Sequence, residues 1–196
     1  SNFDNATVYG ATLVDATVTD SSFNRTKLNG VDLTGSNLTG SKMGNVSLLY
    51  ANLTGADVSY TDMTAADLWY TNFTNADLTG TVVIDASGRS VNMAGADLTG
   101  AAITRSGSYV VGLLHVSDIS GADLTGAYLF GANLSQADLR GARLINTDLR
   151  KANLSRADLQ GAYLLLANLR KADLREAQLS GAFLQGADLT DARFDS

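Results

Sequence analysis

The sequence predicts an all-β solenoid, a rod built from short extended segments joined by regular turns. A large apolar residue recurs every five positions along most of the chain, and a small residue stands two positions before it. A longer period of 20 residues is also visible, since Phe3, Phe23, Met43 and Met63 fall 20 apart. A period of five matches neither a helix nor the alternation of a flat strand. We therefore expect a chain that turns a corner every five residues and closes a coil every four corners.

Each position of the repeat has an expected role. The large residue and the small one two places before it face inward, because alternate residues of an extended segment lie on the same side. The other three positions face solvent and form the turn, which explains their content of Asp, Asn, Thr and Gly. The unit ADLTG at 76–80, 96–100 and 122–126 shows this arrangement.

The repeat runs in two register blocks, and we expect residues 1–196 to form one solenoid domain. The first block covers 1–103 and fails once, at Gly88, where the missing side chain predicts a local bulge. The second block covers 119–196, with its register shifted by one residue. At about 4.8 Å per coil, nearly ten coils give a rod about 45–50 Å long.

Residues 104–118, between the two blocks, are degenerate. We predict a one-residue bulge in an otherwise continuous solenoid, with Tyr109 and either Leu113 or Leu114 as core residues, because the apolar run there favours burial. The alternative is a loop that projects from the rod.

The repeat resembles that of the pentapeptide-repeat family, whose pattern reads A(D/N)LXX, and the resemblance covers nearly the whole chain. It implies a right-handed quadrilateral parallel β-helix with four repeats per coil. Members of that family include inhibitors of DNA gyrase that imitate duplex DNA and confer fluoroquinolone resistance. Others, common in cyanobacteria and chloroplasts, have no assigned biochemical role.

Composition excludes several classes of function. The chain has no Cys, which rules out disulfides and thiolate metal sites, and no apolar stretch long enough to span a bilayer. Its net charge is −6, and residues 1–104 hold 4 basic and 10 acidic residues. We therefore expect no direct binding of nucleic acid, which needs a positive surface. The start at Ser1 suggests a trimmed form, and the cytoplasm, the periplasm and the thylakoid lumen all remain open as compartments.

No catalytic, cofactor or metal site is expected. The single histidine, His115, has Asp118 nearby, but we interpret it as a half-exposed turn residue because nothing else sets up a nucleophile. Asp57, Asp77 and Asp97 would stack in single file, whereas Ca²⁺ prefers converging oxygens. Turn chemistry already explains these carboxylates.

Information about function lies in the outward positions that break the polar pattern, and three groups stand out. The first group is Leu49, Tyr50, Trp69 and Tyr70. Carrying the columns across a one-residue bulge places Phe130 lower on the same face, followed by the second group, the four cations Arg150, Lys151, Arg170 and Lys171. The third group, on the next face, is Arg143, Ile145, Tyr163, Leu165, Leu166 and Phe183.

Aromatic residues and Arg are enriched in protein interfaces, and exposed apolar patches mark binding sites. The sequence therefore predicts a non-catalytic interaction or structural scaffold with a protein partner. Alternatively, the outward aromatics only strengthen the packing between coils. A second functional hypothesis is a DNA mimic that binds gyrase or another topoisomerase, favoured by the family resemblance and the acidic ladder. Neither end shows a helical cap, so a homodimer through a solenoid end is also considered.

Overall fold

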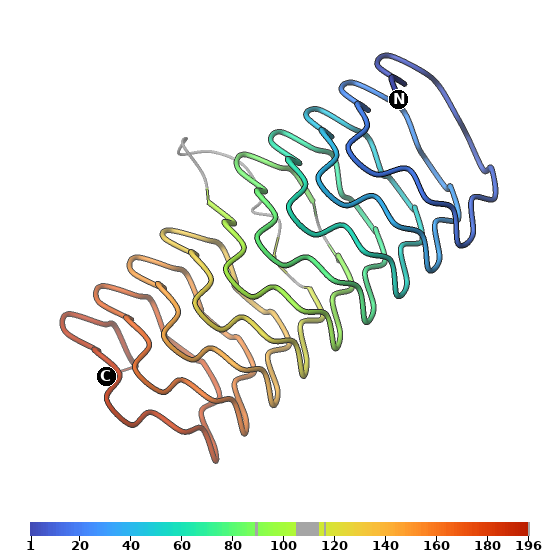
Figure 1. The fold of residues 1–196 in the computed structure, drawn as a ribbon. Coiled ribbons are helices and arrows are strands. Elements are labelled where there is room, and N and C mark those ends of the chain that lie inside the picture. The colour runs from blue at the N-terminus through green and yellow to red at the C-terminus, as the bar shows by residue number, and fades with distance from the viewer. Residues whose placement is uncertain (89, 105–113, 116, 196) are drawn as a thin grey trace.

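The computed structural model describes residues 1–88, 90–104, 114–115 and 117–195 and shows a right-handed quadrilateral parallel β-helix. The coils stack along one axis, and the two termini lie at opposite ends of the rod (Figure 1). Within the described residues no segment forms a helix. Each side of a coil is so short that it contributes a single bridge residue to a parallel ladder, as in Asn2↔Ser22.

Backbone hydrogen bonding explains why the repeat has five residues. In the unit 31–35 every N–H has an acceptor, and only two of the five lie within the same coil. The acceptors, in chain order, are the carbonyl oxygens of Leu28 at 3.3 Å, Ala11 at 2.9 Å and Asn52 at 2.7 Å, then Asp32 Oδ1 at 3.1 Å and the Thr54 carbonyl at 2.9 Å. The Asp32 side chain thus accepts the one N–H, that of Thr34, which the ladder and the corner leave unbonded.

Four ladders run the length of the rod and define its four faces. Face 1 begins at Asn2, face 2 at Thr7, face 3 at Thr12 and face 4 at Thr17. Successive partners on a face are separated by four repeats as far as Ala102, which confirms the predicted coil. The large residues of the repeats fill the interior and are almost fully buried, except in the first and last coils. Buried hydroxyls in the small position donate to backbone carbonyls, as where Thr71 Oγ1 donates to the Leu48 carbonyl at 2.9 Å, but the buried Ser36 hydroxyl has no partner among the described residues.

The predicted one-residue bulge between the two blocks is wrong. The ladders cross the break as Asn92↔Asp118, Asp97↔Asp123 and Ala102↔Tyr128, so ladder partners there are six positions farther apart than elsewhere. This coil is therefore six residues longer than the others. The extra residues fall between Ile103 and Leu114, since the large residues of consecutive repeats are ordinarily five positions apart.

Leu114 fills the large position of face 2 in this coil and is 1% exposed, which confirms it as a core residue. Tyr109 and Leu113 lie outside the described residues, and so does most of the segment that the loop hypothesis concerns.

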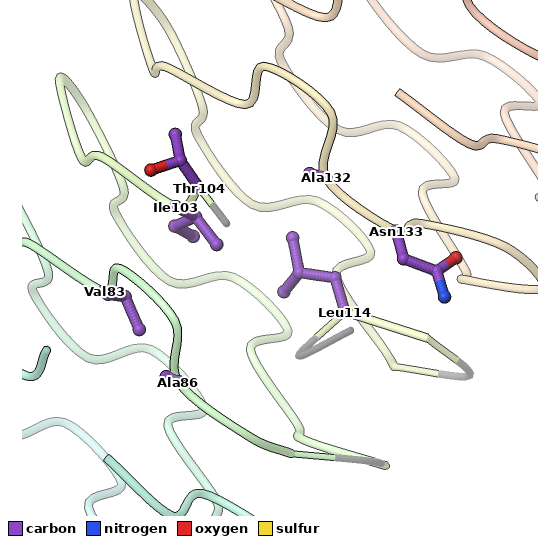
Figure 2. Close-up of a pocket in the computed structure, with 7 residues that line it drawn as sticks. All are labelled: Val83, Ala86, Ile103, Thr104, Leu114, Ala132 and Asn133. Atoms are coloured by element: carbon purple, nitrogen blue, oxygen red, sulfur yellow. The ribbon is translucent and has the colours of Figure 1, made fainter. Parts of the chain in front are cut away.

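The bulge predicted at Gly88 is also absent. The ladder partners on either side of it, Asp67↔Ser87 and Asn72↔Asn92, keep the regular spacing of four repeats. Gly88 stands in the large position one coil before Leu114 and adds no side chain to the core. A small, partly open pocket of about 10 Å³ lies beside this column and is lined by Val83, Ile103 and Leu114 among others (Figure 2). It has room for about one water molecule.

The last residue of each repeat turns the corner with a left-handed backbone, φ between 49° and 71°. Glycine adopts this conformation without strain, and other residues occupy it at a cost. At some corners the preceding coil also limits the space. A Cβ on Gly80 would lie 2.8 Å from the Tyr60 ring, whereas one on Gly100 would meet nothing within 4 Å.

We therefore expect Gly80→Ala to destabilise the protein more than Gly100→Ala. Both variants bear the left-handed strain, about 1 kcal/mol, but only Gly80→Ala must displace the Tyr60 ring. Urea unfolding of the two variants measures the difference, and adding Tyr60→Ala should remove it. Equal losses in both variants would show that the ring moves away at no cost.

Candidate functional site

The three groups of exposed outward residues lie on three different faces. Trp69 follows Asp67 on face 2, whereas Phe130 follows Tyr128, which pairs with Ala102 on face 1. The expectation that the second group continues the face of the first is therefore wrong, because the six extra residues shift the columns. The third group lies on face 4, through the ladder Asp123↔Arg143. Faces 4 and 1 share a corner, so the second and third groups are neighbours.

The first group forms an aromatic stack at the corner of faces 2 and 3. The Tyr50 and Tyr70 rings are 5.0 Å apart and nearly parallel, and the Trp69 ring lies 6.1 Å from that of Tyr70. Tyr50 is 63% exposed, while Leu49 and Trp69 are half-buried or more. Beneath them Asp67 Oδ1 is buried and accepts no hydrogen bond from the described residues.

The second group lies beside an aromatic ring, that of Phe130. The Arg150 guanidinium and the Lys151 ammonium lie 5.4 and 5.2 Å from the Phe130 ring centroid, within the range of a cation–π interaction. The Tyr128 ring stacks 6.4 Å from that of Phe130.

Two carboxylates compensate part of this positive charge. Arg150 Nη2 lies 2.7 Å from Asp148 Oδ2, and Arg170 Nη1 lies 3.3 Å from Asp188 Oδ2. The hydrogen bonds from the Arg150 side chain hold the pKa of Asp148 below its ordinary value. No carboxylate of the described residues lies within ion-pair distance of Lys151 or Lys171.

The third group is apolar apart from Arg143. The Tyr163 and Phe183 rings stack 4.9 Å apart on face 4, and Leu166 is 63% exposed at the corner of faces 4 and 1. A shallow depression beside them is lined by Gly121, Gly141, Arg143, Ile145 and Tyr163. Arg143 Nε lies 3.3 Å from Asp123 Oδ2, which ends the acidic ladder of this face.

These groups share a backbone feature that sequence reasoning missed. Leu49, Phe130, Ile145 and Leu165 occupy the position of Thr34 in its repeat, but Ser47, Tyr128, Arg143 and Tyr163 replace the usual Asp or Asn two places earlier. Their N–H groups consequently have no acceptor among the described residues. The signal in the sequence was the loss of Asp or Asn itself. It also marks Tyr128, which is exposed and was not selected.

The described residues assemble no catalytic triad or metal site. His115 Nδ1 lies 2.8 Å from Ser135 Oγ on face 2, whereas the Asp118 carboxylate on face 3 accepts the Ser120 hydroxyl at 2.7 Å. No three described His, Asp or Glu side chains could together hold a metal ion. Among the same described residues, no helix has the length and apolarity that a membrane crossing requires.

The sequence matches the profile of a family described as pentapeptide repeats, in eight copies, over residues 1–40, 32–69, 70–105, 117–156 and 152–191. No curated protein matches the chain. Among solved structures, a trypsin-treated form of QnrB1, a plasmid-mediated fluoroquinolone resistance protein, is 18% identical. The alignment covers 100% of this chain and 90% of that one, with a TM-score of 0.68. This likeness shows a common fold.

Two other solved structures come from photosynthetic organisms. HetL of the cyanobacterium Nostoc sp. strain PCC 7120, involved in the regulation of heterocyst differentiation, is 27% identical, covers 97% of this chain and 88% of its own, and has a TM-score of 0.38. A pentapeptide repeat protein of the Arabidopsis thaliana thylakoid lumen is 25% identical, covers 73% and 71%, and has a TM-score of 0.16.

The Asp148–Arg150 pair makes stability depend on pH. Because the folded state lowers the pKa of Asp148, the pair stabilises the protein above about pH 4, and this contribution is lost as the pH falls through the lowered pKa. We expect Asp148→Asn, which retains the acceptor for the Arg150 N–H, to destabilise the protein at neutral pH. The difference from wild type should shrink below about pH 4 in urea unfolding. In an Arg150→Gln background the effect should nearly vanish, and an undiminished effect would contradict the ion pair.

Proposed function

The chain belongs to the pentapeptide-repeat family, and we propose that it acts over residues 1–196 as one non-catalytic solenoid whose outer faces bind a protein partner. Large apolar side chains exposed at outward positions of three faces are the observation that carries this proposal. Tyr50, Leu166 and Phe183 lie exposed where the repeat ordinarily places small or polar residues. Exposed apolar surface of this kind favours association with another protein.

Stacking alone does not account for these side chains. The Tyr50–Tyr70 and Tyr163–Phe183 pairs do strengthen the contact between coils. Leu166 gains no such ring partner, and it keeps a left-handed backbone with φ of 58°. The left-handed backbone is common to the corners of this fold, and the exposed apolar side chain of Leu166 is what favours a partner.

The charge pattern does not favour the DNA mimic. Asp57, Asp77, Asp97 and Asp123 form an acidic ladder on face 4, but Arg143 follows them and the next coils of that face carry Tyr163 and Phe183. A surface that imitates duplex DNA requires a longer run of negative charge. Direct binding of nucleic acid is disfavoured for the same reason as before, the net charge of −6.

We expect the Trp69→Ala, Tyr163→Ala double variant to lose a protein that the wild type captures from lysate of the native cell, because interface energy concentrates in buried aromatics. Quantitative mass spectrometry of the captured proteins compares the two. Tyr9→Ala is the matched control, since Tyr9 is exposed outside the three groups. Circular dichroism must show each variant folded, and capture of the same proteins by wild type and double variant would contradict the proposal.

The ends of the solenoid favour a second contact, between two copies of the chain. A recess of about 180 Å³ opens at the first coil, where Phe3, Val8, Leu13 and Val18 turn core side chains toward solvent. Phe194 is exposed at the last coil. End coils also leave ladder N–H and C=O groups unpaired, and strand edges of this kind associate readily.

We expect the protein to form a homodimer that Phe3→Glu or Phe194→Glu disrupts, because a buried charge at an apolar contact is costly. Sedimentation velocity at several concentrations measures the oligomeric state. The variant that is monomeric identifies the end of the rod that forms the contact. Leu166→Glu, on the side of the rod, serves as the control. A monomer at every concentration would overturn the dimer and leave the scaffold proposal intact.

A further inference from the structure

The second and third groups form one continuous surface that runs from face 4 around a corner onto face 1 and ends at the next corner, where Lys151 and Lys171 lie. Outward residues there follow one another along the chain, with Tyr163, Leu165 and Leu166 leading directly to Arg170 and Lys171. The coil before repeats the cations as Arg150 and Lys151, but Arg143 stands there in the position of Tyr163. The apolar side chains of Tyr163, Leu165 and Leu166 therefore adjoin a cationic strip that extends over two successive coils, and a single partner can contact both.

Leu166 lies at the centre of this surface, with its side chain over Gly186 of the next coil and most of its surface still exposed. In the coils before and after it, the same corner holds Gly126, Asn146 and Gly186, residues that tolerate a left-handed backbone. Leu166 adopts φ of 58° and leaves 63% of its surface exposed. Both features are unfavourable in the isolated protein, and burial under a partner would offset the exposure.

The polar groups of this surface are donors in need of acceptors. Lys151 and Lys171 occupy equivalent positions one coil apart, where like charges repel, and the described residues place no carboxylate within ion-pair distance of either. The N–H groups of Phe130, Ile145 and Leu165 have no acceptor among the described residues. Arg150 and Arg170 are already paired with Asp148 and Asp188. A partner that fits must bring negative charge and hydrogen-bond acceptors.

The distribution of charge along the rod agrees with such a partner. Residues 1–104 hold 4 basic and 10 acidic residues, whereas residues 105–196 hold 10 of each. An acidic partner is therefore repelled from the first coils and directed to the later ones. A basic partner would be directed to the opposite half.

We propose, as a refinement that rests on the scaffold function, that this surface binds an acidic polypeptide segment with apolar side chains. The surface comprises Phe130, Lys151, Tyr163, Leu166, Lys171 and Phe183. Apolar side chains of the segment pack around Leu166 and against the Tyr163–Phe183 stack. Its carboxylates pair with Lys151 and Lys171, and its carbonyl oxygens accept hydrogen bonds from the backbone N–H groups.

Fluorescence anisotropy with synthetic peptides tests the chemistry of the partner. The probe is a labelled peptide of Glu, Leu and Phe, compared with peptides in which Lys or Gln replaces every Glu and with a peptide of Glu alone. We expect only the acidic apolar peptide to bind, with an affinity that falls as salt is added. Equal binding of the Lys peptide, or no binding of the acidic apolar one, would overturn the proposal.

Two variants locate the site while preserving the fold. The Lys151→Gln, Lys171→Gln double variant should weaken binding about tenfold and reduce its dependence on salt. Leu166→Gly should weaken binding as well, yet maintain or raise thermal stability, because glycine relieves the left-handed strain. Tyr50→Ala, Tyr70→Ala on the far corner is the control and should leave affinity unchanged. Loss of binding in the control alone would assign the peptide to face 2 and contradict the proposal.

The experiment separates this inference from the scaffold proposal. Capture of the lysate partner is measured with each variant. If capture requires Trp69 and Tyr163 but persists in Leu166→Gly and in the double lysine variant, the scaffold proposal stands and the binding of an acidic segment is refuted. Salt-sensitive self-association that the lysine variant abolishes would assign the surface to a second copy of the chain, which also overturns the inference.

Discussion

Hydrogen bonds between successive coils are the interaction on which the rest of this protein depends. Three of the five N–H groups in a complete repeat reach the coil before or after, and the fourth closes the corner. The fifth bonds to a side chain, as Thr34 N–H does to Asp32. The Asp or Asn before each large residue is therefore part of the backbone pairing, and the repeat needs it wherever no other group replaces it. Coils held in this way depend on their neighbours, so stability accumulates along the rod.

The regular part of the fold was predictable because a single requirement sets it. Every coil must bury four large residues, so the period appears directly in the sequence and places residues such as Leu53 and Leu139 in the core. The break was not predictable in the same way. The interval from Ile103 to Ile119 fits three repeats with one extra residue, and it fits two repeats with six extra residues equally well. The bridges Asn92↔Asp118, Asp97↔Asp123 and Ala102↔Tyr128 distinguish these divisions.

For the candidate site, too, the local sequence pattern predicted which residues depart from the repeat, but it could not predict the faces on which they lie. The residue types that depart from the repeat were visible in the sequence, and Tyr163 and Phe183 do stack, as their spacing of four repeats implies. The face on which Phe130 lies depended on the length of the break and could not be read locally. The N–H groups without an acceptor went unnoticed because no residue that is present points to them. They arise because Ser47 and Tyr128 replace the Asp or Asn whose side chain would accept from the N–H of Leu49 and Phe130.

The direction of the ladders has a mechanical consequence. Bonds between coils run parallel to the long axis, so tension between the two termini acts on the bonds of one end coil at a time. Coils would peel away in sequence, each releasing four repeats of chain, apart from the coil that is six residues longer. A force applied across the rod is instead shared among many coils. The molecule is therefore mechanically anisotropic, compliant when its ends are pulled and resistant when it is loaded from the side.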